Sequence, residues 1–249
     1  MKQPNVAIGY GFIGLLLFLG AWQSIGALHL AGPSIPALTE VLAIFTEPWK
    51  LALLGRAAAA TLLSAATGLV AGALLGAALA MLAHVVLPLR SGLDRISVVV
   101  NAVPAIALGP ILIVTVGRDL TPPTLAAIPV FFLIYVTVSS GLRSISPRLN
   151  DALMIMGAGR VARLFYLEAP AALPAFLSGL RIAVTAAIVG AVVGEWFGAS
   201  TGLGIVILNT MLNFQIPMMW AAVIFAATAS LAAYGILGIC ERYARRRLL

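Results

Sequence analysis

The chain has 249 residues, of which 62% are hydrophobic and only 9% are charged. Charged residues make up about a quarter of an ordinary soluble domain, so this composition excludes one and indicates an integral membrane protein. The formal net charge of +7 does not indicate nucleic-acid binding, because the basic residues lie at the ends of apolar runs. With about 20 residues per span, about five to seven helices fit, and we expect one membrane domain, residues 1–249.

The first apolar run spans residues 6–28. It is too long for the core of a secretory signal and no small-x-small cleavage pattern closes it, so we interpret it as an uncleaved span. In the less apolar stretch 32–56, Thr39 can cap a short helix that Pro48 ends. We expect this helix to lie flat on the membrane surface, with Trp49 at the interface.

The second run, residues 57–83, carries glycines at a spacing of four, Gly68, Gly72 and Gly76. This spacing places them on one helix face, where another helix can approach closely. Packing within the subunit is the favoured interpretation, and a contact between subunits is the alternative.

A basic turn at residues 88–95 precedes the third run, residues 96–116, which Pro104 and Pro110 interrupt. Helices broken in this way often line a pathway, because freed carbonyls need another partner. Asn101 is the only side-chain amide in the run. A hydrogen bond to another helix is the favoured interpretation of Asn101, and a place in the pathway is the alternative.

The fourth run, residues 121–142, leads into a polar stretch that we call the polar loop, residues 146–170. Charges in the loop exclude it from the bilayer, since each would cost roughly 2.5 to 3.5 kcal/mol near a helix centre. Ser146 can cap a first helix that Gly157 stops. A second short helix, residues 159–168, is expected to end at Pro170.

The fifth span must extend over residues 178–197, which places Arg181 at one end and Glu195 at the other. Arg181 can snorkel to the cytoplasmic edge. Glu195 is either an interface anchor, the favoured interpretation, or a group at the mouth of the pathway. A second set of glycines at a spacing of four predicts a close-packing face, namely Gly190, Gly194 and Gly198.

We expect residues 205–212 to form a partly inserted outer segment, residues 217–240 to form the sixth span, and residues 241–247 to form a basic end. With six spans and both ends in the cytoplasm, most of the 15 lysines and arginines lie inside, as the positive-inside rule requires. The inner set is Lys2, Arg90, Arg95, Arg143, Arg148, Arg160, Arg163, Arg181, Arg242, Arg245, Arg246 and Arg247, and the outer set is Lys50, Arg56 and Arg118.

The polar loop resembles the cytoplasmic loop of the permease subunits of ATP-binding-cassette (ABC) importers. That loop carries Glu-Ala-Ala, three residues, Gly, nine residues, then Ile-x-Leu-Pro. Here Asp151-Ala152-Leu153 is followed after three residues by Gly157, and after nine more by Leu167-Glu168-Ala169-Pro170. The likeness extends over Ile106–Pro110, Gly117, Gly179–Arg181 and Gly202–Gly204, covers most of residues 33–247 and is closest to the nitrate, sulfonate and taurine branch.

The resemblance implies an all-α type I ABC importer permease fold with six spans and a cytoplasmic coupling helix pair, in a bacterial inner membrane. It also implies a second, identical permease copy, two ATPase subunits that bind ATP-Mg, and an extracytoplasmic substrate-binding protein. No cofactor is expected on this chain itself. The implied ATPase-docking residues are Asp151, Ala152, Gly157, Ala158, Arg160 and Pro170, and the candidates for lining the pathway are Asn101, Pro104 and Glu195.

Enzymatic chemistry is not expected, because the chain has no phosphate-binding glycine loop with Lys and no Ser-His-Asp set. Its lone Cys240 cannot form an internal disulfide, and no Cys or His cluster has metal-ligand spacing. The alternatives are an ion-coupled transporter, which usually needs an ionisable residue well within a span, and a structural membrane protein. Bicarbonate, nitrate, sulfonates, taurine and pyrimidine precursors all remain open as solutes.

Overall fold

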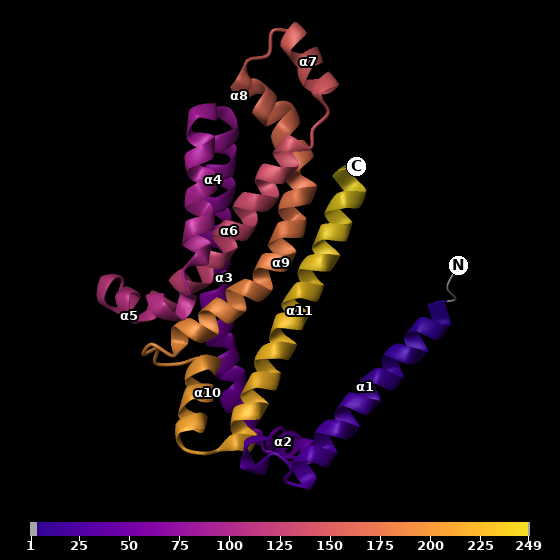
Figure 1. Cartoon of the computed structure of the whole chain (residues 1–249), viewed down its shortest axis with the longest axis vertical. Coiled ribbons are helices and arrows are strands. Elements are labelled where there is room, and N and C mark those ends of the chain that lie inside the picture. Colours follow the sequence, from indigo (N-terminus) through magenta and orange to yellow (C-terminus); the bar gives the residue numbers. More distant parts are fainter. Residues whose placement is uncertain (1–3, 249) are drawn as a thin grey trace. The chain divides into compact units, whose positions relative to one another are not determined.

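The computed structural model describes residues 4–248, and within them it is helical with no strand (Figure 1). The all-α prediction is confirmed, while the predicted inside position of Lys2 lies outside the described residues. The elements are α1 (Pro4–Ala27), η1 (Gly32–Ser34), α2 (Leu38–Ile44), α3 (Pro48–Val85), α4 (Leu87–Ala102), α5 (Ala105–Thr115), α6 (Thr121–Arg143), α7 (Pro147–Ile155), α8 (Arg160–Arg163), η2 (Leu164–Glu168), α9 (Ala169–Glu195), α10 (Leu203–Leu212) and α11 (Ile216–Leu248).

Among the described residues, 5 helices are long and apolar enough to cross a membrane, and there are 6 if the bent pair of α4 and α5 counts as one span. This agrees with the six-span expectation. Helices α3, α9 and α11 extend beyond the predicted spans, and the predicted basic end, residues 241–247, is the last part of α11. Charged residues therefore lie on the ends of continuous helices, where they can leave the bilayer without a break in the backbone ladder.

The predicted third span differs most from the structure, because α4 and α5 meet at 96°. Only Pro104 lies at the break, while Pro110 lies inside α5, so the prediction that both prolines interrupt the helix is wrong. One missing N–H leaves the rest of the ladder intact, and α5 continues through it. The predicted basic turn at residues 88–95 is also wrong, since Pro88 occupies the first turn of α4, where proline fits.

The chain divides into two compact units, residues 1–56 with 206–225 and residues 57–205 with 226–249. In the first unit, Trp22 of α1 donates a hydrogen bond from Nε1 to the carbonyl of Pro36 (3.1 Å), and its ring lies 5.0 Å from that of Trp220. Trp220 in turn donates to the carbonyl of Ser34 (3.1 Å). These contacts hold the segment before α2 against α1 and the start of α11.

Helix α2 forms as predicted, but its ends differ from the expectation. Its N-cap is Ala37, and Thr39 lies inside the helix, where its backbone N–H donates to Oε1 of Gln23 (3.1 Å). Pro48 begins α3 and does not end α2. A proline is favoured in the first turn of a helix, so the same residue that ends one predicted helix starts the next.

In the second unit, α3 packs on α6 through the three predicted glycines. A β-carbon built on Gly68 would lie 2.5 Å from the β-carbon of Ala126, and one on Gly72 would lie 2.5 Å from the carbonyl oxygen of Ala127. Gly76 meets the carbonyl of Phe131 at 2.6 Å. The interpretation as packing within the subunit is confirmed, since small residues let two backbones approach closely.

Helix α9 packs on the same helix α6 through its own glycines. A β-carbon on Gly190 would lie 2.6 Å from the carbonyl of Leu125, and one on Gly194 would lie 2.5 Å from Cα of Pro122. Gly198 does not belong to this face, contrary to the prediction, because α9 ends at Glu195 and Gly198 has a φ of +100°. Helix α6 is thus packed on two sides, and the core between these helices includes Ala126, Val130, Ile134, Tyr135, Ala183, Ala187 and Ala191.

Candidate functional site

Helix α7 of the polar loop has a complete C-terminal cap. Gly157 has a φ of +81°, its N–H donates to the carbonyl of Met154 (3.0 Å), and the N–H of Ala158 donates to that of Leu153 (2.9 Å). This is the Schellman arrangement, which glycine favours because a β-carbon strains the left-handed conformation. The prediction that Gly157 stops this helix is confirmed, and Ser146 occupies the N-cap position, without a side-chain capping bond.

The second helix of the polar loop does not end at Pro170, so that prediction is wrong. Helix α8 continues through η2, a π-helical turn, into α9, and the three form one continuous helix from Arg160 to Glu195. Pro170 lies in the first turn of α9, directly after the π-turn. Pro170 lacks an N–H and so removes one backbone hydrogen bond, but the helix continues past it after the π-turn. The second half of the polar loop is therefore continuous with α9 through a helical backbone.

Large apolar side chains project from both helices of the polar loop. Ile155 is 87% exposed, Met156 79% and Tyr166 84%. The predicted docking residues Asp151 and Ala152 of α7 are exposed as well. A cluster of apolar side chains on a charged segment, outside the apolar spans, is typical of a surface that another protein covers.

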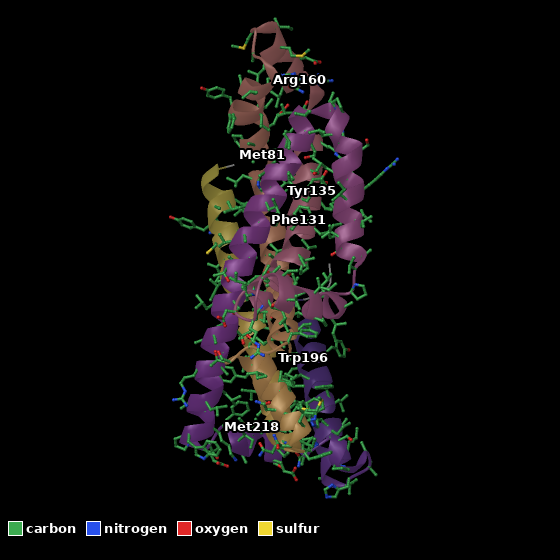
Figure 2. The ribbon with its side chains drawn as sticks, turned by 90° about the vertical axis from the view of Figure 1, so that its left-hand side faces the viewer. Met81, Phe131, Tyr135, Arg160, Trp196 and Met218 are labelled. Carbon is green, nitrogen blue, oxygen red and sulfur yellow. The ribbon has the colours of Figure 1, made fainter. Side chains whose placement is uncertain are left out.

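The remaining predicted docking residues lie within the same loop. Arg160 is exposed, and its Nη1 reaches the carbonyl of Val85 at the end of α3 (3.4 Å). Ala158 is half-buried, and Pro170 is exposed. Figure 2 shows Arg160 at the end of the second unit that α7 and α8 form, with Tyr135 and Phe131 of α6 between it and Trp196.

Two further polar contacts involve the polar loop. One links its two helices to each other, and the other links it to α3. Nη1 of Arg163 donates to Oδ1 of Asn150 (2.9 Å), which links α8 to α7. Nε2 of His84 lies 2.9 Å from Oε2 of Glu168, which links the end of α3 to η2. Glu168 is only 6% exposed, so this contact satisfies a carboxylate that burial would otherwise penalise.

A neighbouring cluster joins α4 to α6. The hydroxyl of Tyr135 donates to Oδ1 of Asp94 (2.7 Å), and Nη2 of Arg143 lies 3.2 Å from Oδ2 of the same carboxylate. Asp94 thus holds two groups that are two helix turns apart on α6. The polar loop and the packed helices are connected by side chains as well as by the backbone of α9.

Sequence reasoning did not identify His84, Asp94 or Glu168 as linking residues. Each is a charged or titratable residue next to an apolar run, and that position is the signal that marks it. The partners come from other helices, so the pairing itself requires the fold. Asp94 was assigned to a turn that is a helix in the structure.

Of the pathway candidates, Asn101 and Pro104 lie on the two sides of the bend between α4 and α5. Both are exposed, and for Asn101 no side-chain hydrogen bond occurs among the described residues. The favoured interpretation, a hydrogen bond from Asn101 to another helix of this chain, therefore finds no support. The exposed amide stays available to solvent, solute or another chain, and a place in the pathway remains a prediction.

Glu195 has a different environment, since it is 1% exposed. Its Oε2 accepts a hydrogen bond from the N–H of Gly204 (2.6 Å), and the hydroxyl of Thr61 accepts one from the N–H of Leu203 (2.8 Å). Both N–H groups lie in the first turn of α10, where helix donors lack partners and the dipole favours negative charge. An interface anchor must reach the surface, so that interpretation is wrong. A place for Glu195 at the mouth of the pathway stays a prediction.

The side chain of Arg181 contacts two residues of α11, which the prediction that it snorkels to the cytoplasmic edge did not include. Its guanidinium lies 4.2 Å from the centre of the Tyr234 ring and 3.4 Å from Oε2 of Glu241 on α11. Glu241 also accepts a hydrogen bond from Ser178 (2.8 Å) and pairs with Arg245 (3.0 Å). These contacts join the middle of α9 to the last part of α11.

Comparison with known proteins gives one family match. The family described as "Binding-protein-dependent transport system inner membrane component" matches residues 68–247. The matched range contains the polar loop, the α3–α6–α9 core and most of α11.

Three curated relatives differ in how much of the chain they cover. A probable ABC transporter permease protein of Haemophilus influenzae is 32% identical over 227 residues, 89% of this chain and 90% of that protein. The putative aliphatic sulfonates transport permease protein SsuC of Bacillus subtilis is 27% identical over 239 residues, 94% and 87%. The formylaminopyrimidine transport permease protein ThiX of Halalkalibacterium halodurans is 36% identical over 139 residues, 55% and 54%.

Proposed function

The chain belongs to the binding-protein-dependent transport system inner membrane component family, and from this membership we propose how it works as the permease subunit of an ABC importer. The subunit itself is not an ATPase, since the family is non-catalytic and ATP hydrolysis lies in separate subunits. We propose that the polar loop binds that ATPase and that the spans form the pathway for a small anionic or polar organic solute.

The observation that carries the docking role is the exposed surface of the polar loop. Ile155 and Met156 at the end of α7 and Tyr166 in η2 are largely exposed, Asp151 of α7 is exposed as well, and the turn after α7 is capped at Gly157. Exposed apolar side chains are unfavourable in water and become favourable when a partner covers them. The rigid turn fixes both helices relative to each other, so the partner meets a preformed surface.

The continuous helix from Arg160 to Glu195 gives the docking surface a mechanical role. An ATPase that moves α8 would move α9 with it, because the helical backbone continues from one into the other. Helix α9 packs on α6 through Gly190 and Gly194, so motion would pass to the helices of the core. The pair of His84 with Glu168 adds the end of α3 to the same moving group.

The proposed assembly contains two copies of this chain, two ATPases and one extracytoplasmic substrate-binding protein. Family membership supports the ATPase and the binding protein as partners. The exposed Asn101 and Pro104, at the bend between α4 and α5, are proposed to line the pathway between the two copies. The relatives' names mention aliphatic sulfonates and formylaminopyrimidine, which are polar or anionic organic molecules.

The proposed orientation places both chain ends and the polar loop in the cytoplasm, in a bacterial inner membrane. The charge distribution along the chain supports it. Single cysteines at Arg160 and Ser200, each in a Cys240→Ala background, should react with a membrane-impermeant thiol reagent from opposite sides. Labelling of both positions from outside would contradict the orientation.

The transport proposal is tested by uptake into proteoliposomes that contain this chain with its ATPase and binding protein. We expect uptake of an aliphatic sulfonate or of formylaminopyrimidine to require ATP inside the vesicle and the binding protein outside. A sodium or proton gradient without ATP is the matched condition and should drive none. Uptake driven by the gradient alone would identify an ion-coupled carrier and contradict the proposal.

A further inference from the structure

A cavity of about 400 Å³ lies in the second unit, between the polar loop and the ends of α3, α4 and α6. Its volume falls within the range of about 300 to 1,000 Å³ that is usual for small-molecule sites. Its titratable lining residues are His84, Arg90, Arg143, Arg160, Arg163 and Glu168. The cavity is thus bounded by four guanidinium groups and a single carboxylate.

The carboxylates near the cavity do not balance its arginines. Glu168 is engaged by His84 at 2.9 Å, and Asp94, beside the cavity, is engaged by Arg143 at 3.2 Å. For Arg90, which is half-buried, no ion pair occurs among the described residues. The lining therefore carries an excess of positive charge.

Arg163 shows the imbalance at the level of single atoms. Its Nη1 donates to the neutral side-chain oxygen of Asn150, while its Nε is buried and has no hydrogen-bond partner among the described residues. Burial of a donor without a partner is unfavourable, and more so on a charged group. An anion in the cavity would supply acceptors and charge together.

We propose that this cavity is a binding site for a phosphate group, carried by an anionic phospholipid headgroup or present as free phosphate. The flat fork of a guanidinium matches phosphate oxygens in pairs, and arginines from α4, α6 and α8 surround the space. Basic pockets between membrane helices are suited to lipid headgroups.

The remainder of the lining makes the phospholipid the better of the two sources. Val85, Leu87, Leu142 and Ile145 form an apolar wall beside the arginines. Free phosphate would use only the charged wall, whereas the glycerol and first acyl carbons of a lipid would use both. A bound headgroup would join α4, α6 and α8, and so stiffen the connection between the polar loop and the core.

The test uses the full chain assembled with its ATPase, in nanodiscs of phosphatidylcholine with or without phosphatidylglycerol. Retained phosphatidylglycerol is measured by native mass spectrometry, and binding of inorganic phosphate is measured separately by calorimetry in detergent. The test variant is the double substitution Arg90→Gln with Arg163→Gln. The matched control is Arg95→Gln, an exposed arginine on α4 outside the cavity lining.

We expect wild type and Arg95→Gln to retain phosphatidylglycerol and the double variant to bind it about tenfold or more weakly, as for lost charged hydrogen bonds. Binding of inorganic phosphate alone, with the same sensitivity to the double variant, would identify free phosphate as the ligand. Arg90→Gln alone should weaken binding as well, and serves if the double variant does not fold.

Equal binding by all variants, or no binding of either probe, would overturn the proposal. Binding by the isolated chain that the ATPase abolishes would also overturn it, and would assign these arginines to an acidic surface of the ATPase. Because the readout is binding and not uptake, failure here leaves the transport function untouched.

Discussion

The α3–α6–α9 core and the polar loop belong to the same compact unit but are stabilised in opposite ways. In the core, the helices pack closely where a residue has no side chain. At Gly72 and Gly190 the backbones of two helices lie next to each other. The polar loop keeps its large side chains and exposes them, with Ile155 and Tyr166 more than four-fifths accessible.

The difference follows from what surrounds each region. Lipid is as apolar as leucine, so helices in a bilayer associate by close packing and gain nothing from hiding large apolar groups. Outside the bilayer the hydrophobic effect operates, and exposed isoleucine and tyrosine favour binding of a partner. The core should therefore be sensitive to added volume, and the polar loop to its backbone turn and charge.

The largest effect is expected from volume added to the core. Gly72→Leu would place a β-carbon 2.5 Å from the carbonyl of Ala127 and 2.8 Å from Cβ of Val130. Overpacking of this kind costs typically about 1 to 3 kcal/mol, a large fraction of a total protein stability of about 5 to 15 kcal/mol. We expect a lower melting temperature in detergent and loss of both ATPase binding and uptake.

Gly55→Leu is the matched control, because it lies on the same helix with nothing within 4 Å of its β-carbon position. Its melting temperature should stay close to that of wild type. A melting temperature unchanged in Gly72→Leu would contradict the close packing of α3 on α6.

The next effect separates docking from folding. Gly157→Val should strain the turn between α7 and α8 by roughly 1 to 2 kcal/mol, because valine disfavours a positive φ. We expect normal insertion and an unchanged melting temperature, weaker attachment of the ATPase, and no ATP-driven uptake. Uptake in proteoliposomes and co-purification of the ATPase measure the two parts.

Gly117→Val is the control for backbone strain, since Gly117 also has a positive φ, +84°, and open space around it. It lies outside the polar loop and should leave ATPase attachment intact. Wild-type uptake by Gly157→Val would remove the docking role from the polar loop.

A smaller effect is expected at the junction of the two regions. His84→Gln, Glu168→Gln and the double variant form a double-mutant cycle across the 2.9 Å contact. We expect a coupling energy of about 0.5 to 3 kcal/mol in unfolding, because the carboxylate is nearly buried. The pair of Lys50 and Glu47, three residues apart in the chain and only half-buried, is the reference, with an expected coupling of about 0 to 1 kcal/mol. Equal couplings would show that α3 is not tied to η2.

The smallest effect is expected from surface charge on α7. Asp151 is exposed, and its side chain makes no hydrogen bond or ion pair among residues 4–248, so Asp151→Lys should leave stability unchanged while it lowers ATPase affinity about tenfold through charge reversal. Asp151→Glu keeps the charge and should stay within about twofold of wild type. Titration of the reconstituted permease with ATPase measures both. Equal affinities for the two variants would mean that the carboxylate does not face the ATPase.

Much of the candidate site could be predicted from the amino-acid sequence. The helix stop at Gly157 depends on a local backbone preference, and the spacing from Asp151 through Gly157 to Pro170 pointed correctly to the family. The close-packing faces at Gly68–Gly76 and Gly190–Gly194 follow from helix periodicity alone. These features depend only on residues that are close together in the sequence, so they can be predicted from the sequence.

The prolines were less predictable, because a proline permits two outcomes. Pro104 marks a break, whereas Pro110 lies within α5 and Pro170 within the first turn of α9. The sequence shows which backbone hydrogen bond a proline removes. Whether the helix continues past it depends on packing and on the preceding turn. The basic stretch at residues 88–95 is helical, and in that helix Asp94 contacts Tyr135 and Arg143 of α6, which no local pattern predicts.

The sequence by itself determined that this is a multi-pass membrane protein of the permease family, because apolar run length and motif spacing are properties of the chain in one dimension. Tertiary structure alone decided the partners of its charged groups, such as His84 for Glu168 and Glu241 for Arg181. It also decided that Glu195 is buried at the start of α10. A buried charge is stable only beside a matching group, and that group lies on another helix, at a distance along the chain that no local pattern encodes.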